Sequence, residues 1–277
     1  MRRLLRLAGM EATGLPKTLQ SLPPLRPEDK LGEGLAAEVY AWGDGQALKL
    51  FRAHVPRTAI EHEVAITKSL AACGAAAPQV RGTVEIEGRL GIVFQRVDGP
   101  SLFDEFLKRP WKLWGAVRLL AETHAAVHRI SAPENFPSQR KQIGHWINGG
   151  NWTAERKAEA VALLERLPEG DRLCHGDFHP GNILLSKAGP VLIDWSCATR
   201  GHPLADVART CVLFETGPVP EGAPPPLKCA MNLLRGLVQR LYLKHYARFH
   251  RINYRELAQW KQVQAAAGGA WANNAFY

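Results

Sequence analysis

Two carboxylates and one amide lie close together in the second half of this 277-residue chain. The segment His175-Gly-Asp-Phe-His-Pro-Gly-Asn182 carries Asp177 and Asn182 five positions apart, and the apolar run Val191-Leu-Ile193 leads directly to Asp194. A carboxylate can accept the proton of a substrate hydroxyl. An amide oxygen and a second carboxylate are ligands that Mg²⁺ prefers. We therefore interpret Asp177 as a catalytic base, and Asn182 and Asp194 as metal ligands, in a phosphoryl-transfer site.

Phosphoryl transfer from a nucleotide requires further elements, and candidates for them precede this segment. Gly32 and Gly34 would let the backbone approach a phosphate chain closely. Lys49, within the predicted strand 46–51, would supply a cation for the phosphates, and an inward-facing ammonium needs an acidic partner. Glu63 follows 14 residues later on a predicted helix, with Glu61 as the competing candidate. A plain hairpin, an edge-strand lysine and a solvated helix face are the simpler interpretations of these residues taken one at a time.

The order of predicted elements indicates two domains joined by a connector at 98–100. The N-terminal part contains a Gly-containing turn that leads into a β segment at 31–42, a hairpin turn at Gly43-Asp-Gly45, and one helix among strands. The part after the connector is mostly helical. The predicted strands are 46–51, 80–87 and 90–95, and the predicted helices are 58–72, 102–107, 111–130, 154–167 and a helical region over 227–264. We assign residues 1–27 to a lead-in, 28–97 to an N-lobe and 98–277 to a C-lobe.

The composition limits the class of protein and its partners. Hydrophobic residues make up 46% and charged residues 22% of the chain, which are ordinary globular values. The formal net charge of +9 favours anionic ligands such as nucleotide phosphates. Because the basic residues are scattered and accompany no nucleic-acid-binding motif, we expect no nucleic-acid partner. The sequence leaves the oligomeric state open.

The cysteine pattern and the hydropathy predict a cytoplasmic protein without membrane insertion. The five cysteines are odd in number and form no CxxC pair, which is typical of a reducing compartment with buried thiols. The basic N-terminal segment 1–8 lacks the apolar core of a signal peptide, and no later apolar run reaches the length that spans a bilayer.

The histidines near Asp177 allow a second interpretation. His175, Asp177 and His179 alternate along the chain, and such residues can ligate zinc or iron in a hydrolase. His124 and His128 stand one helical turn apart and could be further ligands, but in an alanine-rich helix a packing or surface role is simpler. This interpretation gives no function to the upstream lysine and glutamate. We therefore favour phosphoryl transfer, in which His179 either donates a hydrogen bond to the transferred phosphate or is structural.

The motifs together resemble one family, the aminoglycoside phosphotransferases and choline kinase-like proteins, which are relatives of the protein kinases. The resemblance covers roughly residues 30–265 and rests on His175-Gly-Asp-Phe-His-Pro-Gly-Asn-Ile-Leu184, Ile193-Asp-Trp195, Leu31-Gly-Glu-Gly34, Lys49, Glu63 and Gly201-His-Pro-Leu-Ala-Asp206. We expect Asp206 to cap a helix or brace a loop rather than to bind a ligand.

The resemblance implies an α+β, bilobal protein-kinase-like fold with a small β-rich N-lobe and a larger helical C-lobe. It also implies an enzyme that uses ATP and Mg²⁺ to phosphorylate a hydroxyl of a small molecule. Asp177 would be the base, Asn182 and Asp194 the magnesium ligands, and Lys49 the anchor of the α- and β-phosphates, paired with Glu63. The backbone of the hinge, Gln95-Arg-Val97, would contact adenine.

Two features depart from the family's pattern. The last ten residues, 268–277, do not resemble its usual helical end. Between residues 98 and 170 the acidic side chains are mixed with as many bases, which fits poorly with a polycationic aminoglycoside as the acceptor. A catalytically silent nucleotide-binding regulator is the non-enzymatic alternative. A protein kinase is the third, although the chain has no activation segment ending in Ala-Pro-Glu.

Overall fold

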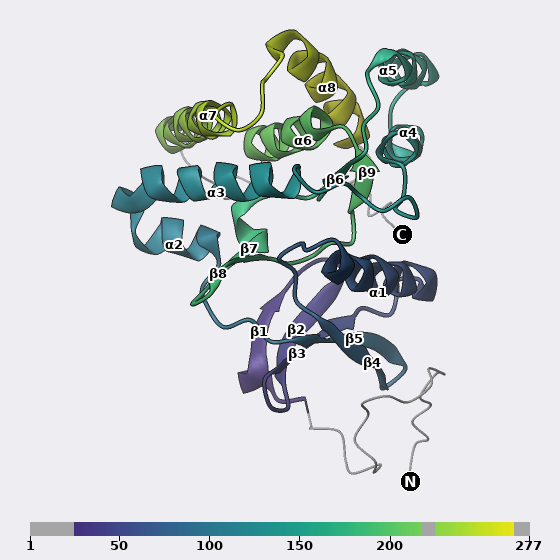
Figure 1. Cartoon of the computed structure of the whole chain (residues 1–277), viewed down its shortest axis with the longest axis vertical. Coiled ribbons are helices and arrows are strands. Elements are labelled where there is room, and N and C mark those ends of the chain that lie inside the picture. Colours follow the sequence, from purple (N-terminus) through teal and green to yellow (C-terminus); the bar gives the residue numbers. More distant parts are fainter. Residues whose placement is uncertain (1–24, 218–224, 269–277) are drawn as a thin grey trace. The chain divides into compact units, whose positions relative to one another are not determined.

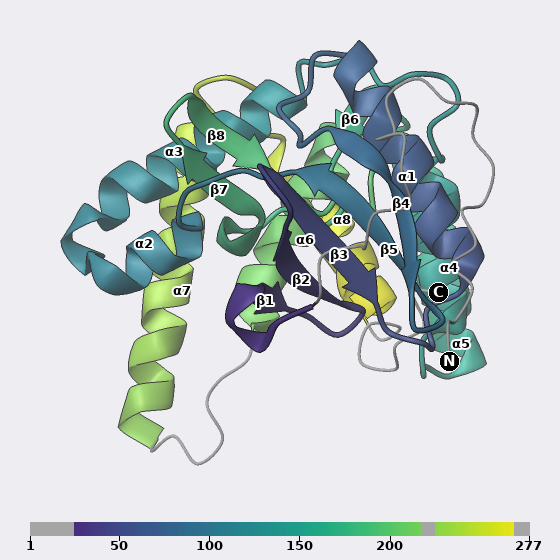
Figure 2. The same cartoon turned by 90° about the horizontal axis from the view of Figure 1, so that it is seen from below.

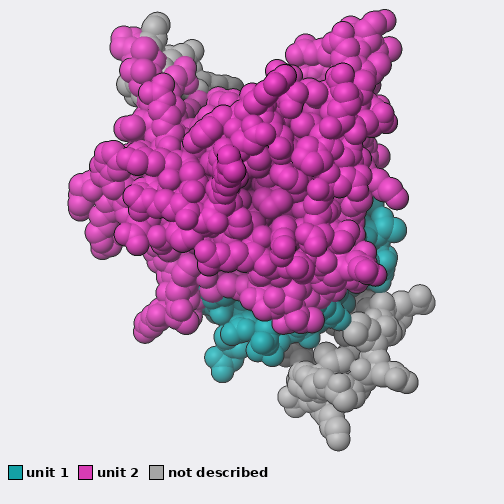
Figure 3. Space-filling view, turned by 45° about the horizontal axis from the view of Figure 1, so that its top comes forward, with its two compact units in different colours: residues 1–68, 77–97 teal, residues 69–76, 98–277 magenta. Residues whose placement is uncertain are grey.

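The computed structural model of the chain describes residues 25–217 and 225–268 (Figure 1). Two predictions therefore lie mostly outside the described residues: the lead-in at 1–27 and the divergent end at 268–277. The chain divides into two compact units, which Figure 3 distinguishes by colour. The N-terminal unit comprises residues 1–68 and 77–97, and the C-terminal unit comprises residues 69–76 and 98–277.

The N-terminal unit is built on a five-stranded antiparallel sheet with the strand order β1-β2-β3-β5-β4. Its elements are η1 (Pro27–Asp29), β1 (Lys30–Glu33), β2 (Ala37–Trp42), β3 (Gln46–Phe51), α1 (Arg57–Ala72), β4 (Val80–Ile86) and β5 (Arg89–Gln95). The predicted hairpin between β2 and β3 is confirmed: Gly43 and Gly45 have φ of 56° and 64°, which is the backbone conformation that glycine adopts most readily.

Alternation along β3 assigns its side chains to opposite faces of the sheet. Leu48 and Leu50 are buried in a cluster with Trp42, Val84 and Val93. Phe51 belongs instead to a cluster with Ile92 and with Ile60 of α1, the helix that lies along the sheet in Figure 2. Lys49 lies two residues before Phe51, with its ammonium 5.2 Å from the Phe51 ring centroid, and therefore shares the face that α1 covers.

The C-terminal unit is mostly helical and carries two small antiparallel pairs of strands, β6 with β9 and β7 with β8. Helix α6 packs against α8, and α3 packs against α7 (Figures 1 and 2). The helices are α2 (Leu102–Lys108), η2 (Pro110–Lys112), α3 (Leu113–Val127), α4 (Gln139–Gly149), α5 (Ala154–Arg166), η3 (Pro180–Asn182), α6 (Pro203–Thr216), α7 (Pro225–Tyr246) and α8 (Tyr254–Ala267), and the strands are β6 (Arg172–Cys174), β7 (Ile183–Ser186), β8 (Gly189–Leu192) and β9 (Thr199–Gly201).

The architecture agrees with the predicted α+β class and differs from the sequence prediction in details. The helix expected from residue 111 begins at Leu113, after a 3-10 turn that Pro110 starts, because proline favours the first position of a helix. The helical region expected over 227–264 consists of two helices, α7 and α8. Helix α4 was not predicted, since it is rich in polar residues and contains Gly144 and Gly149. No helix among the described residues is long and apolar enough to cross a membrane.

Candidate active site

The loop that carries Asp177 begins where strand β6 ends, at Cys174. Gly176 precedes Asp177 and has φ of 79°. A Cβ atom at residue 176 would lie 2.3 Å from the carbonyl oxygen of Cys197, so a side chain cannot fit there. The loop then closes in the single turn η3, which ends at Asn182. We call residues 175–182 the catalytic loop.

The amide and the carboxylate of the catalytic loop are in contact. The Asn182 side-chain amide donates to the Asp177 carbonyl oxygen at 2.9 Å and approaches its carboxylate oxygen Oδ2 at 3.4 Å. His179 Nδ1 accepts from the Gly181 amide at 3.1 Å, and His179 Nε2 lies 3.6 Å from Asp177 Oδ2. The predicted base, the predicted metal-binding amide and His179 therefore occupy one small region, with the His179 side chain 38% exposed.

Asp194 lies beside Asn182 because of strand pairing. Strands β7 and β8 place Ile183 opposite Leu192, and the Ile193 amide donates to the Asn182 carbonyl oxygen at 3.0 Å. Strand β8 ends at Leu192, two residues before Asp194, which has φ of 59°. This left-handed conformation is uncommon outside glycine but is tolerated by aspartate. The Ser196 hydroxyl donates to Asp194 Oδ1 at 2.9 Å.

His175 connects the catalytic loop to the segment that carries Asp194. Its ring Nε2 is 3.1 Å from the Ile193 carbonyl oxygen, and its Nδ1 accepts from the Asp177 amide at 3.3 Å. The buried His175 ring also packs against Trp195, with 4.6 Å between ring centroids. Both ring nitrogens thus have protein partners, as expected for a histidine that orients the loop. This arrangement argues against the alternative in which His175, Asp177 and His179 share a metal.

Helix α6 holds the catalytic loop through three side chains within one turn and a half, at positions 206, 209 and 210. Asp206 accepts from the His175 amide at 2.6 Å and from the Gly176 amide at 2.9 Å. Thr210 donates to the Phe178 carbonyl oxygen at 2.9 Å. The prediction that Asp206 braces a loop is confirmed.

Arg209 is the third of these side chains, and the sequence analysis missed it. Its Nε lies 3.4 Å from the Gly176 carbonyl oxygen, and the side chain is almost fully buried. Burial lowers the pKa of Arg209 to about 9, while the nearby Asp177 acts in the opposite direction. The spacing Asp206-x-x-Arg209-Thr210 within an apolar helix was the signal that could have identified it.

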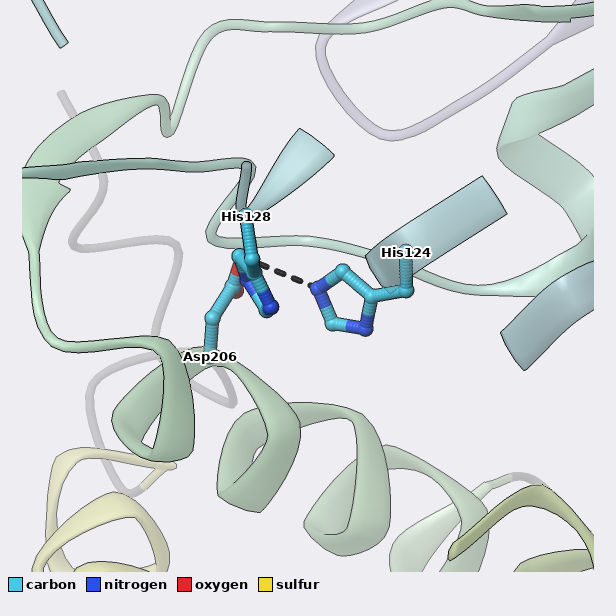
Figure 4. A group of neighbouring side chains, drawn as sticks. All are labelled: His124, His128 and Asp206. Atoms are coloured by element: carbon cyan, nitrogen blue, oxygen red, sulfur yellow. Dashed lines mark hydrogen bonds and ion pairs between the residues drawn. The ribbon is translucent and has the colours of Figure 1, made fainter. Parts of the chain in front are cut away.

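Two histidines complete the surroundings of Asp206 (Figure 4). His124 Nε2 of α3 and Nε2 of His128, the residue that follows α3, lie 3.1 and 3.2 Å from Asp206 Oδ2. Their Nδ1 atoms lie 2.6 Å from the hydroxyls of Tyr242 and Tyr246 on α7. The two histidines are fully buried, so the surface role considered from the sequence is wrong and the packing role is correct.

Within this cluster Asp206 is ionised and His124 is neutral at pH 7. Burial and the neighbouring His128 lower the pKa of His124 to about 3, so this imidazole is neutral at pH 7. Burial alone would raise the pKa of Asp206, but hydrogen bonds from His124 and His128 hold it well below its usual 3.8.

Among the described residues, His124, His128 and Asp206 form the group whose ligand atoms are close enough to hold a metal ion. Every one of those nitrogens already has a tyrosine or Asp206 as its partner. The cluster is therefore a hydrogen-bond network.

The thiols near the catalytic loop are not reactive groups. Burial raises the pKa of Cys197 to about 12, and the pKa of Cys174 is also raised well above 9. A thiol is a nucleophile only when it is deprotonated. Both cysteines therefore have the packing role that the sequence predicted for them.

In the N-terminal unit, Lys49 and Glu63 form a buried ion pair. Lys49 Nζ lies 2.8 and 2.9 Å from the two carboxylate oxygens of Glu63, whose side chain is 3% exposed. Glu63 occurs on the buried stripe of α1 with Ile60 and Leu70. The competing Glu61 lies on the solvent side, where it pairs with Arg57 and is 60% exposed.

The remaining predicted nucleotide contacts lie at the ends of strands. Gly32 is in β1, and Gly34 follows it and donates its amide to Ala37. Neither glycine has a positive φ, and a Cβ atom would meet nothing within 4 Å at either position. The chain itself therefore does not require glycine there. In the hinge, the backbone N–H of Gln95 donates to the backbone carbonyl oxygen of Gln79 at 2.7 Å. The backbone carbonyl of Gln95 and the backbone of Val97 are therefore the candidate contacts for adenine.

An antiparallel N-terminal sheet with a lysine–glutamate ion pair, followed by a helical part with an Asp–Asn catalytic loop, defines a protein-kinase-like phosphotransferase. The chain belongs to the phosphotransferase enzyme family APH, whose sequence profile matches residues 30–260. This membership identifies it as a small-molecule kinase and confirms the family that the motifs indicated.

Solved structures of small-molecule kinases share the fold. Aminoglycoside-3'-phosphotransferase of type VIII has a TM-score of 0.62 and 18% identity, covering 88% of this chain and 92% of that one. Amicoumacin kinase hAmiN, in complex with AMP-PNP, Ca²⁺ and Ami, has a TM-score of 0.61 and 15% identity, covering 92% and 83%. Choline kinase from Cryptosporidium parvum Iowa II has a TM-score of 0.55 and 13% identity, covering 90% and 83%.

Curated relatives are larger proteins. Acyl-CoA dehydrogenase family member 10 of Mus musculus is 28% identical over 181 residues, which are 56% of this chain and 17% of that protein. Acyl-CoA dehydrogenase family member 11 of Gallus gallus is 27% identical over 172 residues, which are 54% of this chain and 22% of that protein. The chain thus spans about a fifth of the length of the curated relatives it matches.

We expect opposite effects on the stability of the protein from substitutions at Gly176, in the catalytic loop, and at Gly115, in helix α3. Gly176→Ala should destabilise the protein by about 2 kcal/mol or more, because the new Cβ meets the Cys197 carbonyl at a positive φ. Gly115→Ala, where a Cβ meets nothing within 4 Å in helix α3, should be neutral or stabilising by up to about 1 kcal/mol. Urea unfolding measures both, and equal stabilities would show that the loop can relax around residue 176.

The burial of His124 predicts that the protein loses stability at acidic pH. The pKa of His124 is lowered by folding, so the unfolded chain takes up the proton first, and stability present above pH 6.5 is lost as the pH falls toward about 3. His124→Gln should remove up to one proton from the proton uptake that accompanies unfolding. The free energy of unfolding would then change less steeply with pH, by up to about 1.4 kcal/mol per pH unit. Urea unfolding between pH 7 and pH 5 measures the slope. His54→Gln, at an exposed position, is the control, and equal slopes for the two variants would contradict the assignment.

Proposed function

We propose that this kinase transfers the γ-phosphate of Mg·ATP to a hydroxyl group of a small molecule, with Asp177 as the catalytic base. The observation that carries the proposal is the geometry of the catalytic loop. The Asn182 amide contacts Asp177, and strand pairing brings the backbone of Asn182 against Ile193, the residue before Asp194. One aspartate is thereby available as a base, while the backbone contact between residues 182 and 193 supports a role for Asn182 and Asp194 in one metal site.

Asn182 and Asp194 fit a magnesium site by their chemistry. Both offer oxygen ligands, and Mg²⁺ is held in nucleotide enzymes by one or two such side chains together with phosphates and water. Because the Asn182 nitrogen donates to Asp177, its carboxamide oxygen is the atom left for a cation. When bound, the ion would neutralise charge on the phosphates.

Asp177 would orient the acceptor hydroxyl and remove its proton as the phosphoryl group is transferred. His179 Nε2, 3.6 Å from Asp177 Oδ2, would donate a hydrogen bond to the transferred phosphate. Arg209 and Asp206 would act indirectly, since both hold the backbone of Gly176. A base fixed in this way needs little rearrangement during the reaction.

Residues of the N-terminal unit would bind the rest of the nucleotide. Lys49 would contact the α- and β-phosphates, and Glu63 would hold its ammonium in place. The open space above Gly32 and Gly34 supports close approach of the backbone to phosphate oxygens. The Gln95 carbonyl and the Val97 amide would contact adenine.

The acceptor that we propose is a small molecule with a hydroxyl group. The solved relatives act on different acceptors, since they include aminoglycoside phosphotransferases and a choline kinase. A polycationic acceptor does not suit this chain, because its net charge is +9 and its acids at 98–170 are mixed with bases.

Asp177→Asn tests the assigned base. Turnover should fall by about 10²- to 10⁴-fold, because general base catalysis supplies a factor of that size, while Mg·ATP binding should stay within a few fold. Coupled ADP release across a panel of hydroxyl compounds measures turnover, and calorimetry measures binding. Asp171→Asn is the matched control, since Asp171 is 55% exposed and pairs with Arg172.

Two outcomes would count against the proposal. Near-normal turnover by Asp177→Asn would show that another group is the base. Binding of Mg·ATP by the unmodified protein without turnover of any hydroxyl compound or protein would favour the catalytically silent regulator.

The ion pair in the N-terminal unit predicts different effects for two glutamates on one helix. Glu63→Gln should lower kcat/KM for ATP about tenfold or more, because the ammonium of Lys49 loses its charged partner. Glu61→Gln should leave it unchanged, since Glu61 is exposed and pairs with Arg57. Initial rates at varied ATP concentrations measure both, with thermal unfolding as a check on folding. Equal effects of the two substitutions would refute the role of Glu63.

A further inference from the structure

Four large apolar side chains form an exposed stripe on the C-terminal unit. Phe103, Leu107, Trp111 and Trp114 are 50, 67, 74 and 60% exposed. They belong to three successive elements, α2, η2 and α3, within residues 103–114. Taking about 200 Å² for each side chain, the stripe exposes roughly 500 Å² of mostly apolar surface, at the upper end of what a monomer usually shows. We call these four residues the apolar stripe.

The apolar stripe is separate from the core of the unit, to which other residues of α2 and α3 contribute. Leu102, Val117 and Leu120 are buried. Helix α2 packs against η3 of the catalytic loop and against β7, and its N-terminus is fixed by a capping box between Ser101 and Asp104. The exposed side chains therefore stand on an ordered support and contribute little to folding.

Cations are interleaved with the apolar stripe. Lys108, Arg109 and Lys112 are exposed and lie between Leu107 and Trp114. Glu105 accepts from Arg109 at 2.6 Å and lies 3.8 Å from Lys112, so part of this charge is compensated locally. Residues 101–114 contain three basic side chains and two acidic ones, Asp104 and Glu105, within a chain whose net charge is +9.

We propose that the apolar stripe and its cations form a docking surface for a lipid bilayer that contains anionic lipids. Tryptophan with leucine and phenylalanine, flanked by lysine and arginine, is the composition of segments that lie in the interface of a membrane. The aliphatic stems of Lys108 and Lys112 extend the apolar area while their ammonium groups reach lipid phosphates. The proposed contact is with the bilayer surface, and no described helix is both long and apolar enough to cross a bilayer.

The cations decide between a bilayer and a second copy of the chain. Cores of protein–protein interfaces are enriched in tryptophan but depleted of lysine. Here Lys108 and Lys112 stand among the apolar side chains, where a second copy would present like charges to them. An anionic lipid surface complements the same charges.

Docking would also place the catalytic loop close to the bilayer. Phe103 and Leu107 of the apolar stripe belong to α2, and α2 contacts η3 of the catalytic loop. A bilayer on the outer side of α2 would lie about one helix diameter, roughly 10 Å, from the catalytic loop. The proposal does not depend on the acceptor or on the assignment of Asp177.

Vesicle sedimentation of the full chain tests the proposal. The protein should bind vesicles of phosphatidylcholine mixed with phosphatidylserine at least about tenfold more strongly than phosphatidylcholine alone, and added salt should reduce the difference. Trp111→Ser with Trp114→Ser should lower binding about tenfold or more. Lys108→Gln with Lys112→Gln should remove most of the preference for phosphatidylserine.

Two control variants carry the same kinds of change elsewhere. Tyr254→Ser removes an aromatic side chain that is 61% exposed, and Lys141→Gln with Arg166→Gln removes two exposed charges from α4 and α5. Both should bind as the unmodified protein does. Circular dichroism melting of every variant establishes that folding is unchanged.

Three results would overturn the proposal. The first is equal binding to both kinds of vesicle, and the second is unchanged binding after the double tryptophan substitution. The third is a dimer in sedimentation velocity that the double tryptophan substitution dissociates, without vesicle binding, because the apolar stripe would then be a contact between copies.

Discussion

Asp206 is a buried carboxylate that receives hydrogen bonds from the amides of His175 and Gly176 and from the rings of His124 and His128. Removing a charge from water costs several kcal/mol, and hydrogen bonds to a charged group contribute about 1.5–3 kcal/mol each. Four donors can therefore offset this cost. They come from α3 and from the catalytic loop, while the carboxylate belongs to α6. A hydroxyl of α7 supports each histidine. The position of the catalytic loop thus depends on three helices that converge on one charge.

This anchoring explains how the loop can present Asp177, the base that we propose. The loop residues cannot form regular structure: Gly176 has a positive φ, and η3 is a single turn. Backbone groups in such a segment need partners outside it. Asp206 and Thr210 supply partners for residues 175, 176 and 178, which leaves the carboxylate of Asp177 in contact with Asn182 and near His179. In the N-terminal unit, the partly buried ammonium of Lys49 is likewise held by a carboxylate from another element.

Much of this arrangement could be predicted from the sequence, because local patterns carry it. The alternation of residues over 46–51 predicted strand β3, and Gly43-Asp-Gly45 predicted the hairpin turn before it. The helical pattern over 58–72 predicted a helix that carries Glu61 and Glu63 as the two candidate partners of Lys49. The sequence could not choose firmly between Glu61 and Glu63, since only the packing of α1 on the sheet buries one of them. It also missed Arg209 and the His124–Tyr242 and His128–Tyr246 pairs. The two His–Tyr contacts each join residues 118 positions apart, and no local pattern encodes them. The polar helix α4 escaped prediction because it lacks a strong apolar stripe.

The central claim is that Asp177, Asn182 and Asp194 act together on the phosphates of a magnesium-bound nucleotide. A crystal structure of the protein with Mg²⁺ and a non-hydrolysable ATP analogue tests it most directly. We expect a cation bonded to the Asn182 carboxamide oxygen and the Asp194 carboxylate at about 2.1 Å, with the terminal phosphate nearest to Asp177. A cation held instead by His124, His128 and Asp206, or a nucleotide bound away from the catalytic loop, would contradict the account.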